Sequence, residues 1–503
     1  MKKLIIFCII FLIIPVNICG LNHSDKLYEN IERSRETIFV GGSGPNNFSS
    51  IQSAIIYADD GDIIFIYKGT YYENIVIDKR LIIIGEDKKD TIIDGSGVGN
   101  VVKFSANFIN LQNITIQNSG KEFTDSGVII FSSNSSLTNM IVKDTNWGLY
   151  LTEFSEKIEI KDNIITNNTR GIYSFTGGKN NIVTFNTITN NIYSGIFFYA
   201  TKGNIIEKNS LCYNGNGFVV DYSNNNSIIK NEIINNIYDG IILIDSSNNN
   251  IILNNSILGH YLGGIYIGDN SSFNIVENNS IYFNNNGIDL EFSNSNNIYG
   301  NIIRSNEQFG ISLIESSNNI VGKNMIQYGN GHGLNLIESD DNLIEENIIE
   351  YNNESGASLF WSENNIITKN KFDHNDPLHI QLRSSSFDNI IYLNNFFNNS
   401  CSVSDLCSNL WDFKGKGNFW SDFEERYPDA KKIWLRGVWN TPYEIPNNDN
   451  KDQQPLIKQW PNSLSTTSNF QNKFYNFKYP LLHFLFDFFP NIISTFINLI
   501  RLS

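Results

Sequence analysis

The sequence contains few basic residues and few cysteines. Its 503 residues include 36 Lys and Arg against 52 Asp and Glu, a formal net charge of -16. This balance excludes nucleic acid as an expected partner, because a phosphate backbone requires a basic surface. Beyond the first 20 residues only Cys212, Cys401 and Cys407 remain. Cys401 and Cys407 are near enough in sequence to close a small disulfide loop, and we expect Cys212 to be a buried thiol.

Histidine and methionine are also scarce. The chain has six histidines and three methionines, and they form no cluster of the kind that a copper site requires. The sequence therefore gives little support to a copper centre built from imidazole or soft sulfur ligands.

The N-terminus has the composition of a signal peptide. Residues 1–18 read MKKLIIFCIIFLIIPVNI, two lysines followed by an apolar run. We expect cleavage near Cys19 or Gly20, with lipid attachment at Cys19 as an alternative, so that residues 1–20 are removed and 21–36 form a linker. This predicts an extracellular, cell-surface or periplasmic protein.

Most of the chain is an internal repeat of about 23 residues. One column of glycines recurs every 21 to 24 residues, at Gly127, Gly148, Gly171, Gly195, Gly217, Gly240, Gly264, Gly287, Gly310, Gly333 and Gly356, with Pro377 taken as the next member. A second column is asparagine, at Asn113, Asn139, Asn163, Asn186, Asn209, Asn231, Asn255, Asn279, Asn301, Asn324, Asn347, Asn370, Asn395 and Asn418. A third is also asparagine, at Asn181, Asn204, Asn226, Asn250, Asn274, Asn297, Asn319, Asn342, Asn365 and Asn389.

The spacing within each repeat predicts an all-β solenoid. Apolar residues, mainly isoleucine, alternate with polar ones over short stretches, which is typical of strands. Three short strands and three turns account for one repeat, so each repeat is one triangular coil. Asparagine suits the corners, because it tolerates a left-handed backbone and its amide can bond to the same amide in the next coil. A leucine-rich repeat is disfavoured, because leucine is scarce at the inward positions and no helix fits between the strands.

The ends of the stack are predicted to be capped. Residues 37–68 form the N-terminal cap, with a strand and an amphipathic helix around 50–58. We predict about 14 coils over residues 69–420, a C-terminal cap over 421–460, and a linker with an aromatic and apolar tail over 461–503. The stretch 479–503 is a candidate for membrane or envelope contact, as a spanning or an interfacial segment.

At three places the chain resembles the NosD-like type of right-handed parallel β-helix, a pectin-lyase-like fold named for a periplasmic copper-related protein and described as carbohydrate-binding and sugar-hydrolysing. The resemblance covers residues 37–460. It rests on SIQSAIIYADDGDIIFIYKGTYYENIVIDKRLIIIGED near the start, on the Gly-Ile and Asn-Ile repeats, and on GNFWSDF, NTPYEIP and QPLIKQW near the end. It implies a single right-handed solenoid. The fold hosts many activities, so function must be argued from a site.

One outer face of the solenoid is predicted to carry aromatic residues. In the strand that each glycine opens, residues two and four positions later should point outward. These positions include the candidate carbohydrate-binding residues Tyr150, Tyr173, Phe197, Tyr199 and Tyr266. Flat sugar rings stack on such side chains. The alternative is that a loop, the tail or a partner covers this row.

Carboxylates follow the same strands. Asp245 and Asp269, and likewise Glu315 and Glu338, occupy equivalent positions in adjacent coils. Carboxylates this close either share a proton or bind a cation, so these four residues are candidate calcium ligands. The alternative is a solvated acidic face.

Catalytic candidates are grouped near the C-terminal end. The segment HNDPLHIQLR contains His374, Asp376, His379 and Arg383. It is partly similar to the Asp-Pro-His motif of uronate epimerases, and it offers a base and an arginine for a carboxylate. The alternative is an irregular surface coil without catalytic function.

A second short motif nearby is a weaker match. The tripeptide GHG at 331–333 is similar to a polygalacturonase motif, but in that family an Asp pair precedes the histidine, whereas Asp340 and Asp341 follow it here.

The sequence thus predicts an exported β-helix protein that binds a polysaccharide or other glycan along its outer face. The alternatives are a polysaccharide lyase, epimerase or hydrolase acting on an anionic glycan, and a copper-handling accessory protein of the NosD type.

Overall fold

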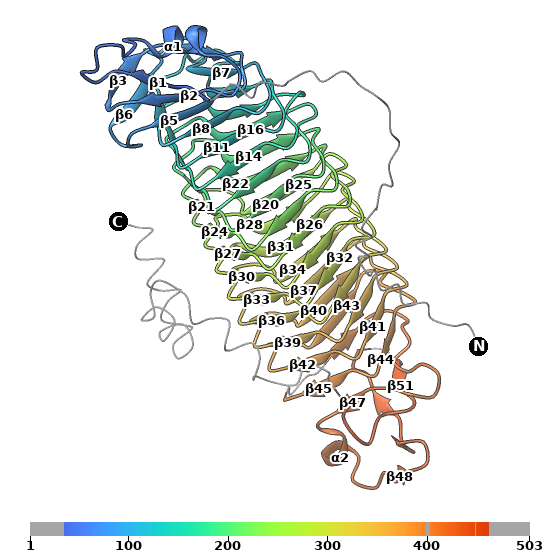
Figure 1. Cartoon of the computed structure of the whole chain (residues 1–503). Coiled ribbons are helices and arrows are strands. Elements are labelled where there is room, and N and C mark those ends of the chain that lie inside the picture. Colours follow the sequence, from blue (N-terminus) through green and yellow to red (C-terminus); the bar gives the residue numbers. More distant parts are fainter. Residues whose placement is uncertain (1–34, 399–402, 448, 462–503) are drawn as a thin grey trace, which may run out of the picture. The chain divides into compact units, whose positions relative to one another are not determined.

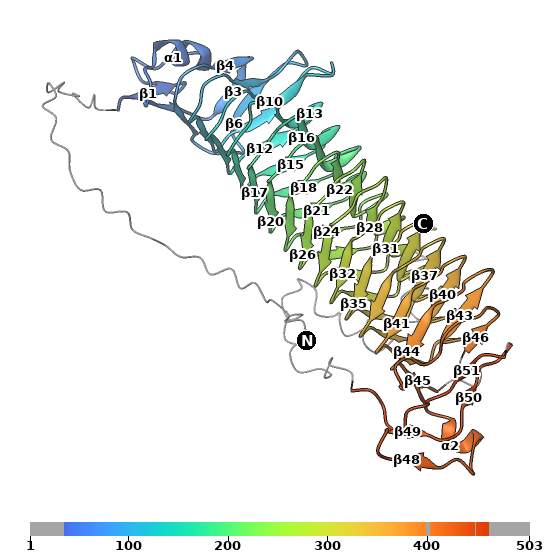
Figure 2. The ribbon, with the colours of Figure 1, turned by 90° about the vertical axis from the view of Figure 1, so that its right-hand side faces the viewer.

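The structure, a computed structural model, describes residues 35–398, 403–447 and 449–461. The compact unit that begins at Glu36 is a stack of coils (Figures 1 and 2). The predicted signal peptide, nearly all of the linker over 21–36, the tail from residue 462 and Cys401 of the predicted disulfide lie outside the described residues. Within the described ranges, neither helix has the length and hydrophobicity to cross a bilayer.

Three parallel sheets form the walls of the stack. Sheets I and II have 16 strands each and sheet III has 15, and the chain passes through I, II and III in turn within each coil. The predicted all-β parallel solenoid is confirmed. The predicted number of coils, about 14, is slightly low, because the strands of the predicted N-terminal cap already belong to sheet I.

Sheet I consists of β1 (Thr37–Val40), β2 (Ile63–Ile66), β5 (Ile82–Gly85), β8 (Asn110–Gln112), β11 (Ser136–Thr138), β14 (Glu159–Lys161), β17 (Ile182–Thr184), β20 (Ile205–Glu207), β23 (Ser227–Ile229), β26 (Ile251–Leu253), β29 (Ile275–Glu277), β32 (Asn297–Tyr299), β35 (Ile320–Gly322), β38 (Leu343–Glu345), β41 (Ile366–Thr368) and β44 (Ile390–Tyr392).

Sheet II consists of β3 (Gly69–Tyr72), β6 (Thr91–Asp94), β9 (Thr115–Gln117), β12 (Ile141–Lys143), β15 (Ile164–Thr166), β18 (Thr187–Thr189), β21 (Ser210–Cys212), β24 (Glu232–Ile234), β27 (Ser256–Leu258), β30 (Ser280–Tyr282), β33 (Ile302–Arg304), β36 (Met325–Gln327), β39 (Ile348–Glu350), β42 (Lys371–Asp373), β45 (Asn395–Phe397) and β47 (Phe419–Trp420).

Sheet III consists of β4 (Ile75–Ile77), β7 (Val102–Phe104), β10 (Ser126–Ile130), β13 (Trp147–Leu151), β16 (Arg170–Phe175), β19 (Ser194–Tyr199), β22 (Asn216–Asp221), β25 (Ile241–Ile244), β28 (Gly263–Ile267), β31 (Asn286–Glu291), β34 (Ile311–Ile314), β37 (Leu334–Ile337), β40 (Ala357–Phe360), β43 (Ile380–Arg383) and β46 (Val403–Asp405).

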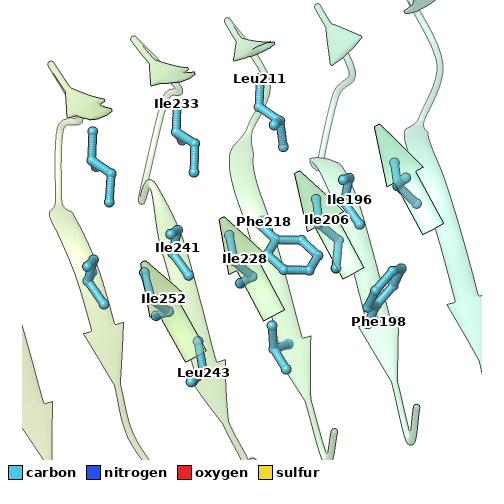
Figure 3. Close-up of a cluster of buried hydrophobic side chains, with 14 of the residues drawn as sticks. Ile196, Phe198, Ile206, Leu211, Phe218, Ile228, Ile233, Ile241, Leu243 and Ile252 are labelled. Carbon is cyan, nitrogen blue, oxygen red and sulfur yellow. The ribbon is translucent and has the colours of Figure 1, made fainter. Parts of the chain in front are cut away.

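Apolar side chains from all three sheets fill the interior of the stack. In β25, Ile241 and Leu243 are fully buried, whereas Ile242 and Ile244 face outward and are half-buried. Figure 3 shows how such inward side chains stack on those of the neighbouring coils. Each fully buried aliphatic side chain contributes about 1.5–3 kcal/mol, and inward-facing apolar side chains recur along the whole stack.

Buried asparagines form ladders at the corners, as predicted. Asn301 donates from its backbone N–H and its side-chain Nδ2 to Oδ1 of Asn324, at 2.9 and 3.0 Å. Four predicted members are off by one residue. The ladders contain Asn394 and Asn296 in place of Asn395 and Asn297. Asn113 and Asn139 precede the ladder position, because Met140, not Asn139, donates its N–H to Asn163.

A third ladder, which the spacing analysis missed, lies where sheet II turns into sheet III. It contains Asn168, Asn191, Asn214, Asn236, His260, Asn284, Asn306, Asn352 and Asn375. His260 interrupts the asparagines, and burial lowers its pKa to about 4.

The left-handed residues are not the ladder asparagines themselves. In the ladder that includes Asn209 and Asn231, the positive φ angles belong to the preceding residues, Lys208 (57°) and Lys230 (54°). In this ladder one asparagine does not serve both purposes, contrary to expectation. Asn113 and Asn139 do so in earlier coils, since both are left-handed and Asn139 Nδ2 donates to Asn113 Oδ1 at 2.6 Å. The left-handed conformation costs roughly 1–2 kcal/mol at such residues. The hydrogen bonds of the adjacent buried asparagine offset that cost.

The caps close both ends of the stack. Helix α1 (Ile51–Tyr57) begins at Ser50, whose Oγ accepts from Ser53 N–H, and buries Ile51 and Ile55. Figure 2 shows α1 lying across the first coils. At the other end lie α2 (Phe423–Arg426) and two antiparallel strand pairs. β48 (Lys432–Ile433) pairs with β49 (Val438–Trp439), and β50 (Tyr443–Glu444) pairs with β51 (Lys451–Asp452).

Cys212 differs from its prediction. Leu211 is the inward residue of β21, so Cys212 faces outward and is half-buried. Its Sγ lies 3.3 Å from Oγ of Ser210.

Candidate functional site

The outer face of sheet III differs in chemistry from coil to coil, and it is the face on which most of the predicted site residues lie. Three rows run along it. The entry row consists of the residues directly before the glycine column, and rows two and four consist of the residues two and four positions after it.

An aromatic cluster covers this face over strands β10, β13, β16 and β19. It consists of Ile129, Trp147, Tyr150 and Tyr173, with Phe131, Phe175 and Phe197 packed against it. Phe123, in the loop before β10, contacts the rings of Trp147 and Tyr173 edge to face, at 5.8 and 6.3 Å.

Two predicted carbohydrate-binding residues are therefore poorly accessible. Tyr150 is 8% exposed and Tyr173 is 3% exposed, and burial raises the pKa of Tyr173 to about 12. Phe197 and Tyr199 are half-buried, as is Tyr266 farther along. Outward orientation did not ensure exposure here, because neighbouring aromatic side chains cover one another.

Arg170 in the entry row packs on the aromatic cluster. Its guanidinium carbon lies 4.4 to 5.6 Å from the ring centroids of Phe197, Trp147, Tyr173 and Tyr193. Sequence analysis did not single out Arg170, because the charge is separated in sequence from the rings that surround it.

Three well-exposed aromatics lie one step earlier in the coil, at the turn that leads into sheet III. Tyr193, Tyr238 and Tyr261 are 57%, 49% and 68% exposed. We call these three residues the entry tyrosines. They were missed because the analysis considered only positions after each glycine.

Two carboxylic acids face each other beside the entry tyrosines. A β-carbon placed on Gly263 would lie 3.0 Å from Oδ1 of Asp239 and 3.5 Å from Oδ2 of Asp289, so both groups lean over this glycine. Asp239 also accepts from the N–H of Gly263 at 2.7 Å, and Asp289 accepts from Nδ2 of Asn286 at 2.9 Å.

The pKa values of this pair are raised. Burial raises the pKa of Asp239 to about 6. Burial, with the nearby charges of Asp239 and Glu291, raises the pKa of Asp289 to about 7, although its bond from Asn286 acts in the opposite direction. Both residues are half-buried and reach solvent. The sequence signals were the acid in row two and the pair Gly263-Gly264.

Tyr266 completes this group. Its hydroxyl donates to Oε2 of Glu291 at 2.8 Å, and burial together with this bond raises its pKa. We call Asp239, Tyr266, Asp289 and Glu291 the acidic group. Two coils earlier, burial and the neighbouring Asp245 raise the pKa of Asp221 to about 6.

A second polar group lies nearer the C-terminal cap. Nε2 of His332 lies 3.1 Å from Oε2 of Glu354, and Nδ1 accepts from the N–H of Ser355 at 3.1 Å. Burial lowers the pKa of His332, and the charge of Arg383 adds to that effect.

The predicted catalytic residues do not form one site. The strand register pairs Ala357 with Ile380, so His379, not Pro377, is equivalent to the glycine of the preceding coil. His379 was expected to point outward, but it is fully buried. Its Nε2 lies 2.7 Å from the carbonyl oxygen of Phe397, and burial lowers its pKa to about 4.

The other three members of that prediction are exposed or half-buried, unlike His379. His374 is exposed, contacts Asp373 at 2.7 Å and stacks on Tyr351 at 4.9 Å. Asp376 is exposed in the turn, whereas Arg383 is half-buried in row four. The charge of Arg383 acts on His332, so Arg383 belongs to the surroundings of the second polar group.

The predicted metal ligands occupy exposed, left-handed positions that follow the strands of sheet III. Asp245, Asp269, Glu315 and Glu338 have φ angles between 47° and 54°. Glu315 and Glu338 line one open hollow together with Asp340 and Trp361. In the described part of the chain, no three His, Cys, Asp or Glu side chains converge as metal ligands. Calcium at these pairs stays a prediction.

Two family descriptions match the chain. Residues 263–425 match "Periplasmic copper-binding protein (NosD)", and residues 126–281 match "Right handed beta helix region". These matches confirm the resemblance to the NosD-like right-handed β-helix. No curated protein matches the chain by sequence.

Several solved structures of other proteins are similar to the chain at low TM-scores. The A-module of the mannuronan C-5 epimerase AlgE6 from Azotobacter vinelandii is 14% identical, with 72% of this chain and 95% of that chain covered and a TM-score of 0.36. The Dettilon tailspike protein is 17% identical (66% and 64% covered, TM-score 0.41), and a GH87 alpha-1,3-glucanase catalytic domain is 14% identical (60% and 64% covered, TM-score 0.41). None of these similarities bears on the activity of this chain.

Copper does not fit the residues present in the NosD-matching region. His332 and His379 use ring nitrogens in hydrogen bonds to backbone groups, and Met325 contacts Nη2 of Arg304 at 3.1 Å. No cluster of three ligands occurs among the described residues. We therefore derive no copper chemistry from this structure.

Proposed function

We propose that the protein is exported and binds a polysaccharide across the outer face of sheet III, with the entry tyrosines and the acidic group as its central contacts. The observation that carries the proposal is the position of exposed rings beside half-buried carboxyl groups. Tyr238 directly precedes Asp239, and Tyr261 lies two residues before Gly263, over which both carboxyls lean.

The chemistry of this stretch suits a sugar polymer. Exposed aromatic faces accept the apolar faces of sugar rings, and tyrosine hydroxyls add hydrogen bonds. Carboxylates and the amide of Asn286 bind sugar hydroxyls as acceptors and donors. An apolar surface rimmed by polar groups is typical of an interaction site. Coils repeat about every 4.8 Å, so a polymer crossing several coils would meet one set of contacts in each.

A retention assay tests the proposal. The full chain is passed through gels that contain one of a panel of neutral and uronic-acid polysaccharides, and its mobility is compared with that in gels without polymer. We expect Tyr238→Ala with Tyr261→Ala to weaken retention by roughly tenfold or more, because two stacked rings are lost.

The matched control is Tyr72→Ala with Phe185→Ala. These residues are 72% and 49% exposed and lie in sheet II and at the turn between sheets I and II. Equal retention of the two double variants would contradict the proposal, as would a wild-type chain that binds no polysaccharide.

A second function, proton-transfer catalysis on the bound glycan, is favoured by the acidic pair. With a pKa of about 6, Asp239 is mostly ionised at pH 7, whereas Asp289, with a pKa of about 7, is half protonated. Two carboxyl groups with different protonation states at one place are the arrangement that acid–base catalysis requires.

The catalytic function has a distinct readout. Asp239→Asn and Asp289→Asn should each abolish the appearance of new chain ends or altered sugars and leave retention measurable. Asp162→Asn, at an exposed turn between sheets I and II, is the control. A wild-type chain that is retained without forming any product would leave binding as the function and remove catalysis.

A further inference from the structure

We infer that the surface around Arg170 is a subsite for an acidic substituent of the glycan, a carboxylate in the first instance, so that the ligand is an anionic polysaccharide. This inference rests on the proposed function and specifies its substrate class. It starts from the exceptional environment of one charged side chain.

Arg170 has no acidic partner in the described part of the chain. No carboxylate oxygen there lies within 4.0 Å of its guanidinium, and its side chain donates no hydrogen bond to described residues. Its Nε is buried without an acceptor. A half-buried charge without a partner is costly, and here burial lowers the pKa of Arg170.

Aromatic rings compensate part of that cost and fix the position of the guanidinium. The ring of Phe197 lies 4.4 Å from the guanidinium carbon and that of Trp147 lies 5.0 Å away. Cation–π contacts of this kind use the faces of the planar group. They leave the N–H groups at its edge without acceptors, and a carboxylate pairs with that edge through two parallel hydrogen bonds.

The adjacent coil supplies a second polar group without a partner. Ser194 is paired with Arg170 in the strand register, is 1% exposed, and its Oγ has no hydrogen-bond partner in the described chain. A buried hydroxyl without a partner is destabilising unless a ligand or water satisfies it.

The position of the subsite agrees with the proposed polymer path. Tyr193 directly precedes Ser194 and contacts the guanidinium of Arg170 at 5.6 Å. It is one of the entry tyrosines and is 57% exposed. A sugar ring that stacks on Tyr193 would therefore carry a substituent past Arg170, three coils before the acidic group.

The test compares one polymer in two charge states. A polyuronate and its carboxyl-reduced, neutral form are each titrated against the wild-type chain, Arg170→Met, Arg170→Lys and the control Arg304→Met. Arg304 is a suitable control because it is also half-buried and lies on sheet II, away from the proposed path.

We expect Arg170→Met to weaken polyuronate binding by roughly tenfold or more, as expected for the loss of a charge-assisted pair, and to leave binding of the neutral polymer unchanged. Arg170→Lys should recover part of the affinity. Arg304→Met should match the wild type, and added salt should weaken polyuronate binding more for the wild type than for Arg170→Met.

Three results would overturn the inference. Unchanged polyuronate binding by Arg170→Met removes the subsite, and an equal loss for both polymers assigns Arg170 to packing. Wild-type binding to the neutral polymer alone removes the anionic substrate class and leaves the proposed function intact. Wild-type binding to neither polymer contradicts the proposed function itself.

A sulfated polymer in a parallel titration distinguishes sulfate from carboxylate as the bound group.

Discussion

The outer face of sheet III is closed over strands β10 to β19 and open around strands β28 and β31. Around Tyr150 and Tyr173, aromatic side chains cover one another and little of them reaches solvent. Around Tyr266 and Asp289, the same rows carry half-buried polar groups that reach solvent. Beneath both regions the inward residues are equally buried; Ile172 and Ile265 are both 0% exposed. The interior therefore sets the coil, and the outer rows are free to differ in chemistry.

The largest expected difference between the two regions is in stability. Tyr173→Ala should lower the free energy of unfolding by about 3 kcal/mol, because it removes a nearly buried ring with several aromatic neighbours. Tyr266→Ala should cost about 1 kcal/mol, since it removes a half-buried ring and one hydrogen bond to Glu291. Equilibrium urea denaturation of both variants measures the difference. Similar losses would show that the two regions are packed alike.

The pH dependence of stability should sharpen the comparison. The pKa values of Asp239 and Asp289 rise from near 4 in the unfolded chain to about 6 and about 7 in the folded chain. Between pH 4 and pH 7 the folded state therefore binds more protons than the unfolded state. The stabilisation that these two groups provide below pH 4 is lost as the pH rises to 7.

The double variant Asp239→Asn with Asp289→Asn isolates this effect from other titrating groups. Its stability should fall less than that of the wild type between pH 4 and pH 7, by about 1–2 kcal/mol after allowance for solvent screening. Thermal denaturation at a series of pH values provides the measurement. Parallel curves for the two proteins would show that these carboxyls have ordinary pKa values.

The smallest expected effect comes from filling the space over Gly263. Gly263→Ala would place a methyl group 3.0 Å from Asp239 Oδ1, so this flexible carboxylate must shift by a few tenths of an ångström. Stability should change by about 0.5 kcal/mol or less, as for other mild surface changes. Polysaccharide retention should fall by roughly twofold to fivefold, which corresponds to about 0.4–1 kcal/mol of binding free energy from this carboxylate. A variant with unchanged retention would separate Asp239 from binding.

The repeat period and the alternation of isoleucine were sufficient to predict the parallel solenoid and its corners. These features follow from the spacing of residues within one repeat, and stacking keeps that spacing from coil to coil. The third ladder was missed because His260 and Gly329 interrupt its asparagines. The orientation of His379 was predicted wrongly because Pro377 was taken as the residue equivalent to the glycine column. The turn from Asn375 has the same length as the turn from Asn352 in the preceding coil, so His379 is the equivalent of Gly356.

The candidate site was less accessible to sequence reasoning. The alternation of apolar and polar residues predicted which side chains of sheet III point outward. Their exposure, however, depends on neighbours in other coils. Phe123, for example, covers Tyr173 from a loop about 50 residues earlier. The entry tyrosines lie in turns, where spacing varies from coil to coil. Asp239 and Asp289 belong to two coils that are separated by a third. Their carboxyl groups approach each other over Gly263 of that third coil, because glycine has no side chain to separate them.

The most direct test of the central claim is hydroxyl-radical footprinting of the full chain with and without the polysaccharide that it binds best. We expect protection of Tyr193, Tyr238 and Tyr261, with unchanged oxidation of Tyr57 and Phe185, which are comparably exposed on α1 and at the turn between sheets I and II. Protection of Phe185 in place of the entry tyrosines would place the glycan on another face and contradict the account.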